Sequence, residues 1–145
     1  MHAVPVSDPA VARVLANEAI RDLLSRYCFA VDAGDFDAMA ALFAADTGSI
    51  DGGVVGFHQG RPAIADAFRA LTASTPTTWS HLMGNIVITH TDSGTAEVES
   101  AFHGVQQEPG GPVVLGAAGR YSDQVAAIDG AWQFVSRVIH LDLIG

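Results

Sequence analysis

An acid stands at Asp32, where the local sequence gives no reward for a negative charge. Leu24, Cys28 and Asp32 are four residues apart, so their side chains stack on one face of a helix. The first two are apolar, which indicates a buried face, and the macrodipole near a helix C-terminus disfavours a carboxylate. An acid at an interior position against local preference indicates a functional site. The alternative is an exposed residue at a fraying helix end.

Histidine is the second residue type with chemical potential, because its imidazole exchanges protons near neutral pH. His81, in Trp79-Ser-His-Leu-Met, and His103 and His140 all lie in segments with strand character. A lone strand histidine is more commonly a structural residue than a catalytic one. From the residues alone, both interpretations stay open for all three.

Several chemistries lack their sequence signals. There is no His-x-His or HExxH pattern for a metal, no GxGxxG or P-loop for a nucleotide, and no GxSxG elbow for a serine hydrolase. The expected chemistry therefore uses no metal and no cofactor. A net charge of −9, with 7 basic residues that are all arginine and form no cluster, argues against nucleic acid and acidic membrane surfaces as partners.

The composition is that of one globular domain over residues 1–145, in which 49% of the residues are apolar. No stretch reaches the ~20 apolar residues that a bilayer span needs, and the first residues lack the features of a secretion signal. Cys28 is the single cysteine, so no intramolecular disulfide forms. We expect a cytoplasmic protein whose residues 1–8 are flexible.

The first half of the chain reads as helical. Ser7 or Asp8 caps a first helix that Gly34 ends, and Asp35 caps a short second helix whose apolar face extends to Phe43. A third helix begins at 60–62, where Gly-Arg-Pro places a proline in the first turn. Between the second and third helices, residues 47–58 are expected to form a short strand pair.

The second half reads as an antiparallel meander. Four strands are expected over 79–90, 95–108, 113–128 and 131–143, with Asp129-Gly130 as a strong hairpin signal. Helices followed by a meander imply an α+β fold: a cone-shaped, curved antiparallel or mixed sheet wrapped around three N-terminal helices and enclosing an apolar pocket.

The chain resembles the SnoaL-like polyketide cyclase and dehydratase group of the nuclear transport factor 2-like superfamily over about residues 10–143. The matching segments are Ala19-Ile-Arg-Asp-Leu-Leu-Ser-Arg-Tyr27, Gly34-Asp-Phe-Asp-Ala-Met-Ala-Ala-Leu-Phe43, Gly60-Arg-Pro-Ala-Ile64, Ser80-His-Leu-Met-Gly-Asn85, Gly119-Arg-Tyr-Ser-Asp123 and Asp129-Gly-Ala-Trp-Gln-Phe134. These are specific for the fold and not for one reaction. The resemblance is sharpest to members of the scytalone dehydratase and dehydrochlorinase type.

Those members imply a general-base pair made of Asp32 and His81. In such a pair the carboxylate orients the imidazole and stabilises its charged form, which contributes on the order of 10²–10⁴-fold in rate. Tyr27 matches a tyrosine that lines the site in some dehydratases, and would assist as a hydrogen-bond donor. Five further residues are expected to contact the substrate: His103, His140, Asn85, Trp79 and Phe43.

The leading hypothesis is a cofactor-free lyase or isomerase acting on a small, apolar, cyclic substrate with a hydroxyl or carbonyl group. Polyketide cyclisation by an aldol route begins with the same proton abstraction and stays open. A non-catalytic domain that binds a small ligand or forms oligomers is the alternative from a different class. Apolar residues on the outer sheet face predict self-association; the resemblance implies a homodimer or, in the dehydratase-like branch, a homotrimer.

Overall fold

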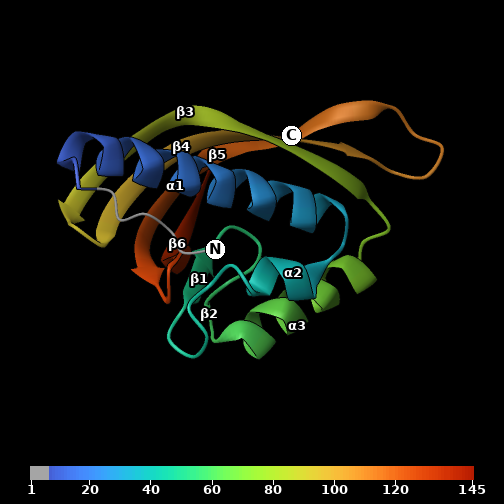
Figure 1. Ribbon diagram of the computed structural model, residues 1–145. Helices are drawn as coiled ribbons and strands as arrows, with labels where there is room; N and C mark the ends of the chain where they lie inside the picture. The colour runs from blue at the N-terminus through green and yellow to red at the C-terminus, as the bar shows by residue number, and fades with distance from the viewer. Residues whose placement is uncertain (1–6) are drawn as a thin grey trace.

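The computed structural model describes residues 7–145, which form three helices on one side of a six-stranded sheet (Figure 1). The elements are α1 (Pro9–Asp32), α2 (Phe36–Ala40), β1 (Ser49–Gly52), β2 (His58–Gln59), α3 (Arg61–Ala73), β3 (Thr78–Asp92), β4 (Thr95–Gln107), β5 (Val113–Ile128) and β6 (Ala131–Ile144). The prediction of a flexible start over 1–8 falls mainly on residues 1–6, which lie outside the described residues. No helix within 7–145 has the length and apolar character that crossing a membrane requires.

Helix α1 begins and ends at the predicted signals. The Ala10 backbone N–H donates to the Asp8 side chain at 2.8 Å, and Pro9 occupies the first turn, where its missing N–H is not needed. The helix stops at Asp32, and Gly34 follows with a φ of 71°. Its buried face carries Ile20, Leu23, Leu24, Tyr27 and Cys28.

Helix α2 is shorter than its apolar stripe predicts. Asp35 caps it by accepting a hydrogen bond from the Ala38 N–H at 3.1 Å, but the helix ends at Ala40. The chain then leaves the helix so that Phe43 forms an isolated parallel bridge with Phe134. A tertiary pairing therefore overrides the local helical pattern at this point.

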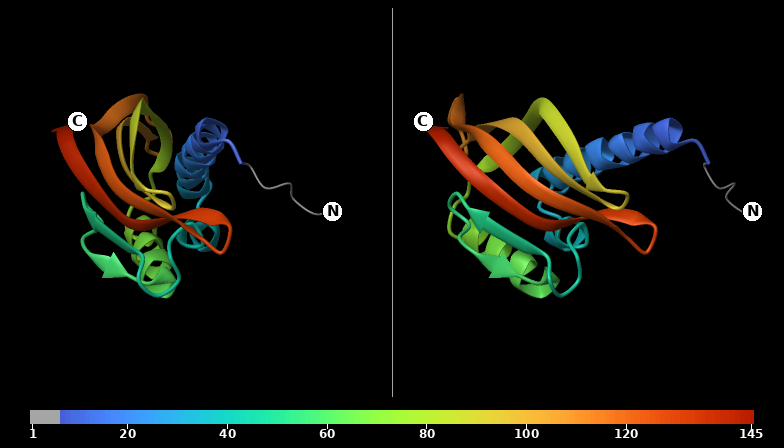
Figure 2. Two further views of the ribbon diagram at one scale, coloured as in Figure 1. Left: turned by 60° about the vertical axis from the view of Figure 1, so that its left-hand side comes forward. Right: turned by 90° about the vertical axis from the view of Figure 1, so that its left-hand side faces the viewer.

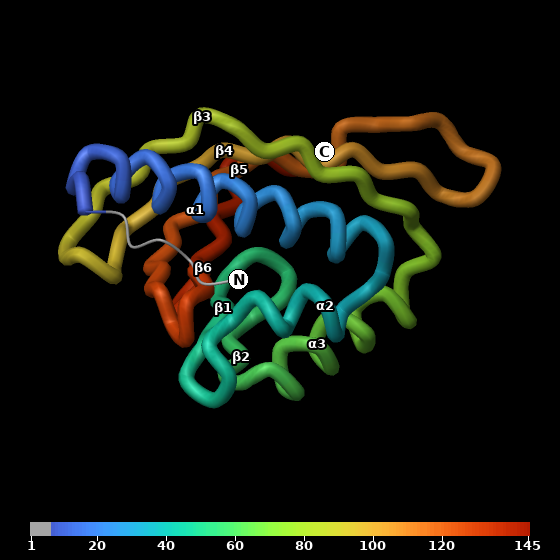
Figure 3. The backbone as a smooth tube through the Cα atoms, viewed as in Figure 1, coloured from blue at the N-terminus to red at the C-terminus, as the bar shows by residue number. Residues whose placement is uncertain are grey.

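The strands run in the order β2-β1-β6-β5-β4-β3, and Figure 3 traces the path. The predicted meander of β3 to β6 is confirmed, with antiparallel pairing throughout. The predicted short strand pair is also confirmed as β1 and β2. β1 joins the meander by pairing in parallel with β6, so the sheet is mixed.

The sheet is curved and open, and its inner face packs against the helices (Figure 2). Along β4 the burial alternates residue by residue, as expected for a strand with one buried face. Val98, Ser100 and Phe102 point inward, whereas Glu97 and Glu99 point outward. The α+β prediction, with helices on one side of a curved sheet, is confirmed.

An ion pair with no solvent exposure occupies the centre of this inner face. Arg137 on β6 donates through Nε and Nη2 to the two carboxylate oxygens of Asp123 on β5, at 2.8 and 2.9 Å. The rings of Tyr27, Tyr121 and Phe134 lie 3.8 to 4.5 Å from the guanidinium carbon. Burial acts to lower the pKa of Arg137, but the Asp123 carboxylate more than offsets this, so the guanidinium stays charged.

We expect Asp123→Asn to lower the free energy of unfolding by about 3–5 kcal/mol, because it leaves a buried guanidinium without its counter-charge. Urea denaturation followed by circular dichroism measures the loss. The matched control is Asp142→Asn, which breaks the exposed Arg120–Asp142 pair on the same two strands and is expected to cost far less. Equal losses in the two variants would contradict the central role of the buried pair.

Candidate active site

The Asp32 carboxylate makes two hydrogen bonds to the same residue, His81. Its Oδ1 lies 2.6 Å from the imidazole Nδ1, and its Oδ2 accepts from the His81 backbone N–H at 2.7 Å. Asp32 is the last residue of α1, and His81 is the fourth residue of β3. The pair therefore ties the C-terminal end of the long helix to the start of the edge strand, across 49 positions of sequence.

This geometry selects the tautomer of His81. An ionised carboxylate only accepts hydrogen bonds, so Nδ1 carries the proton that it shares with Asp32. The lone pair of the neutral ring is then on Nε2, which makes no hydrogen bond to any residue within 7–145. A nitrogen with a free lone pair, backed by an oriented carboxylate, is the arrangement of a general base.

The pair is shielded but not sealed from solvent. The side chains of His81 and Asp32 are 16% and 20% exposed. The His81 ring has two aromatic neighbours: Trp79, which stacks on it with centroids 5.8 Å apart, and Phe102, whose centroid is 6.2 Å away. Trp79, one of the predicted substrate contacts, thus lies directly beside His81.

Tyr27 lies elsewhere on the inner face, in the aromatic cluster around Arg137. Its ring contacts Phe43, Tyr121 and Phe134 edge-on, and only 3% of the residue is exposed. Burial raises its pKa well above the usual range, so the phenol stays protonated. Tyr27 contacts Tyr121, Tyr121 stacks on Phe102, and Phe102 neighbours His81. Two rings therefore separate Tyr27 from the imidazole along this row.

Cys28, on the helical face between Leu24 and Asp32, belongs to the core as predicted. Burial raises the pKa of its thiol to about 11. The thiol is therefore neutral at physiological pH and does not serve as a nucleophile.

Two predicted substrate contacts lie on the opposite face of the sheet from His81. His103 is exposed and pairs with Leu82, the outward neighbour of His81. The Nε2 of His140 lies 3.1 Å from the Ser122 hydroxyl, which donates to Glu99 at 3.0 Å. The expectation that His103 and His140 face the site is therefore corrected.

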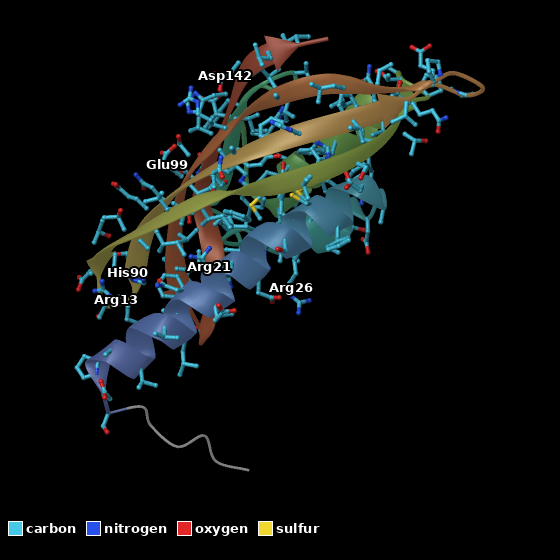
Figure 4. All side chains as sticks on the ribbon, turned by 90° about the horizontal axis from the view of Figure 1, so that it is seen from above. Arg13, Arg21, Arg26, His90, Glu99 and Asp142 are labelled. Atoms are coloured by element: carbon cyan, nitrogen blue, oxygen red, sulfur yellow. The ribbon has the colours of Figure 1, made fainter. Side chains whose placement is uncertain are left out.

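The reason differs between the two histidines. His103 follows the inward Phe102 directly, and adjacent strand residues point to opposite faces. His140 would point inward if the alternation from Phe134 continued unbroken, but Val135 is an extra residue in β6, because Phe134 and Ser136 pair with consecutive residues of β5. This bulge reverses the alternation. Figure 4 labels Glu99 and Asp142, which lie away from α1 on this outer side.

Asn85 and Phe43, which the sequence analysis expected to contact the substrate, also lie elsewhere. Asn85 is exposed at a bulge in β3, where its φ of 51° is in the left-handed region that asparagine tolerates. Phe43 has no exposed surface and packs against Phe134 with centroids 5.0 Å apart. One residue ends a regular stretch of strand and the other fills the core, so neither lines an accessible site.

Sequence reasoning missed two neighbours of His81, Phe102 and Gly104. Phe102 approaches the imidazole as described above, and a Cβ placed on Gly104 would lie 3.7 Å from the His81 Cδ2. Their signal is present in the alternation of β4, where Val98, Phe102 and Gly104 share a face. Gly104 lies opposite His81 because of the register between β3 and β4, and the sequence of β4 alone does not reveal that register.

Two surface hollows lie beside the helices. One, of about 480 Å³, is lined by residues of α1 and α2 such as Phe29 and Ala38 together with Leu42, and the other, of about 280 Å³, lies between α2 and α3. Neither is lined by Asp32 or His81, so the apolar pocket expected at the pair stays a prediction. No group of three or more metal-ligating side chains is arranged around a common point within 7–145.

Solved structures share this fold at low sequence identity. The candidate scytalone dehydratase of Novosphingobium aromaticivorans is 22% identical with a TM-score of 0.82, covering 94% of this chain and 90% of that chain. A hexachlorocyclohexane dehydrochlorinase, LinA type 2, is 17% identical with a TM-score of 0.82, covering 94% and 91%. The β subunit of a candidate aromatic-ring-hydroxylating dioxygenase from N. aromaticivorans is 24% identical with a TM-score of 0.77, covering 93% and 94%.

A comparison with curated proteins finds no match. A model of the SnoaL-like domain family, in contrast, matches residues 12–138, which include most of α1, the whole of β3 to β5 and both members of the Asp32–His81 pair. This match spans most of the chain and agrees with the nuclear transport factor 2-like fold of the solved structures. The protein belongs to the SnoaL-like domain family.

Proposed function

We propose that this protein is a cofactor-free lyase or isomerase in which His81 is the general base and Asp32 orients it. The observation that carries the proposal is the double hydrogen bond from His81 to Asp32, which fixes both the backbone and the ring of the histidine. The His81 side chain is 16% exposed and its Nε2 makes no hydrogen bond to residues within 7–145, which supports a role for this nitrogen towards a substrate. The dehydratase and dehydrochlorinase among the structural neighbours support an elimination.

With the proton of His81 on Nδ1, the lone pair on Nε2 is the group that would start the reaction. Nε2 takes a proton from a carbon beside a carbonyl or leaving group, and the C–H electron pair becomes the new double bond. The imidazolium that forms is stabilised by the Asp32 carboxylate. The leaving hydroxyl departs with its bonding electrons and takes the proton back from Nε2, so that one water is released and the base is regenerated.

The substrate that suits this chemistry is a small, apolar, cyclic molecule with a hydroxyl or carbonyl group. Trp79 and Phe102 provide apolar surface beside the base. Tyr27 packs against Arg137 and not His81, so we assign it to holding α1 in place. An aldol cyclase would use the same first step, and the product, with or without loss of water, separates it from a dehydratase.

A non-catalytic role is the second candidate. The observation that favours it is the similarity to a dioxygenase β subunit, which is one chain of a larger assembly. Under this hypothesis the Asp32–His81 pair is a structural tie between α1 and β3. The two candidates differ in whether the pair moves protons to and from a ligand.

Proton abstraction is measurable before the natural substrate is known. We expect the protein to catalyse deuterium exchange from D₂O into the carbon next to the carbonyl of a cyclic ketone, or loss of water from its β-hydroxy derivative, both followed by NMR. His81→Gln and Asp32→Asn are each expected to lower the rate by about 10²-fold or more, because each removes part of the base.

His140→Gln is the matched control, since it removes a histidine from the outer face and is expected to leave the rate unchanged. Denaturation midpoints verify that every variant is folded. If His81→Gln and Asp32→Asn retain full exchange activity, His81 is not the base. If the cyclic ketones and their β-hydroxy derivatives bind but undergo neither exchange nor loss of water, the non-catalytic candidate replaces the proposal.

We also propose that the protein self-associates through the outer face of its sheet. This face carries exposed Leu82, Val105, Leu115 and Leu143, and the pairing register aligns Leu82 and Leu143 in one row across four strands. Helices α1, α2 and α3 lie on the other side (Figure 2). Apolar surface of this kind marks an interface, and a homodimer is the simplest closed assembly, with a homotrimer as the alternative.

Light scattering coupled to size exclusion tests this interface. We expect more than one copy for the wild type and a monomer for Leu82→Glu combined with Leu143→Glu, because two buried charges would oppose association. Val54→Glu, at a 72% exposed position in the β1–β2 connection, is the matched control and should not change the mass. A monomeric wild type, or a double variant that still assembles, would refute the interface.

A further inference from the structure

We propose that Trp79 is a positioning residue that holds the His81 imidazole in the plane required by Asp32, and that Gly104 and Gly116 are glycines because they make room for its indole. This inference rests on the proposed role of His81 as the base. It adds a group that acts through the histidine without touching the reacting atoms.

The first support is the stacking geometry. Trp79 and His81 are two residues apart on β3 and point to the same face. Their rings are nearly parallel, with an interplanar angle of 19° and centroids 5.8 Å apart. An offset stack of this kind favours one orientation of the imidazole over others.

The second support is the surface on which the indole lies. A Cβ on Gly104 would come within 3.1 Å of the Trp79 Cζ3, and a Cβ on Gly116 within 3.0 Å of its Cη2. Gly104 and Gly116 lie on β4 and β5, so the six-membered ring of the indole spans two strands. On Gly116, a Cβ would also meet the Gln106 side chain at 2.8 Å.

Neither glycine is required by its backbone. The glycines with a positive φ in the described part of the chain do not include Gly104 or Gly116, so their conformations are open to any residue. A glycine in the middle of a strand is destabilising, because it adds conformational entropy to the unfolded chain and buries no side chain. Space for Trp79 is the physical reason that remains for Gly104, and it contributes at Gly116.

The consequence for His81 is a restricted ring. Rotation about its Cβ–Cγ bond would carry Nδ1 away from Asp32, and the Trp79 stack opposes that rotation. Phe102 contributes a second aromatic neighbour. The indole lies beside the imidazole, where it would limit the access of water to the Nδ1–H hydrogen bond to Asp32.

The molecule provides its own control in Trp132 and His90. This second tryptophan–histidine pair, of β6 and β3, meets edge-on, at 84° with centroids 6.1 Å apart. His90 bonds to Asn17 instead of to a carboxylate, at 2.7 Å. Removal of Trp132 therefore tests whether loss of any indole loosens the fold enough to affect His81.

The experiment is NMR detection of the His81 Nδ1 proton in the ligand-free protein, assigned by its loss in His81→Gln. Its exchange rate with water is measured in the wild type, Asp32→Asn, Trp79→Leu, Trp79→Phe and Trp132→Leu. We expect exchange to be roughly threefold to tenfold faster in Trp79→Leu, intermediate in Trp79→Phe and unchanged in Trp132→Leu, as the strength of an aromatic pair implies.

The role of Gly104 in making room for the Trp79 indole is tested by a double-mutant cycle. Gly104→Ala should accelerate exchange in the wild type and add little in the Trp79→Leu background, because its effect passes through the indole. Gly94→Ala, where a Cβ meets nothing within 4 Å, is the matched control. Additive effects of Gly104→Ala and Trp79→Leu would overturn the assignment of Gly104.

The outcomes separate this inference from the proposed function. If Trp79→Leu and the wild type exchange equally while Asp32→Asn exchanges faster than both, Trp79 has no positioning role and the base proposal stands. If Asp32→Asn exchanges like the wild type, the Asp32–His81 bond does not protect the proton, and both proposals fail. Trp79→Phe keeps the test decisive if Trp79→Leu does not fold.

Discussion

The buried Arg137–Asp123 pair is the interaction around which the rest of the structure is arranged. A guanidinium with no solvent exposure is tolerable only if its charge is matched and its faces are covered. Asp123 supplies the charge from the neighbouring strand, and rings from α1, β5 and β6 supply the cover. These demands fix where α1 crosses the sheet, and thereby where its last residue lies.

Burial on the inner face of the sheet decreases from the Arg137–Asp123 pair towards the Asp32–His81 pair. Rings connect the two ends: Tyr121 on Arg137, Phe102 stacked on Tyr121 at 4.4 Å, and His81 next to Phe102. At one end a charged pair is fully buried, whereas at the other the imidazole retains partial access to solvent. A fully buried charge pair thus supports the Asp32–His81 pair without being part of its chemistry.

Sequence reasoning succeeded where the signals are local. The Asp8 cap, the Gly34 stop and the Asp129-Gly130 hairpin depend on a few adjacent residues, and all three are confirmed. The partner of Asp32 came from family resemblance, since spacing identifies a helical face but not what lies opposite it. The parallel pairing of β1 with β6 and the outward face of His140 depend on tertiary contacts and a bulge that no local pattern encodes.

The interval from Tyr27 to Asp32 has a consequence for how this chain tolerates changes of length. The two residues lie on one continuous helix and are held by different partners, Arg137 and His81. Inserting one residue between them would turn Asp32 by about 100° around the helix axis and move it by ~1.5 Å. The number of residues between Tyr27 and Asp32 is therefore fixed by the two contacts. Insertions and deletions are tolerable in connections such as 108–112, which carry no such constraint.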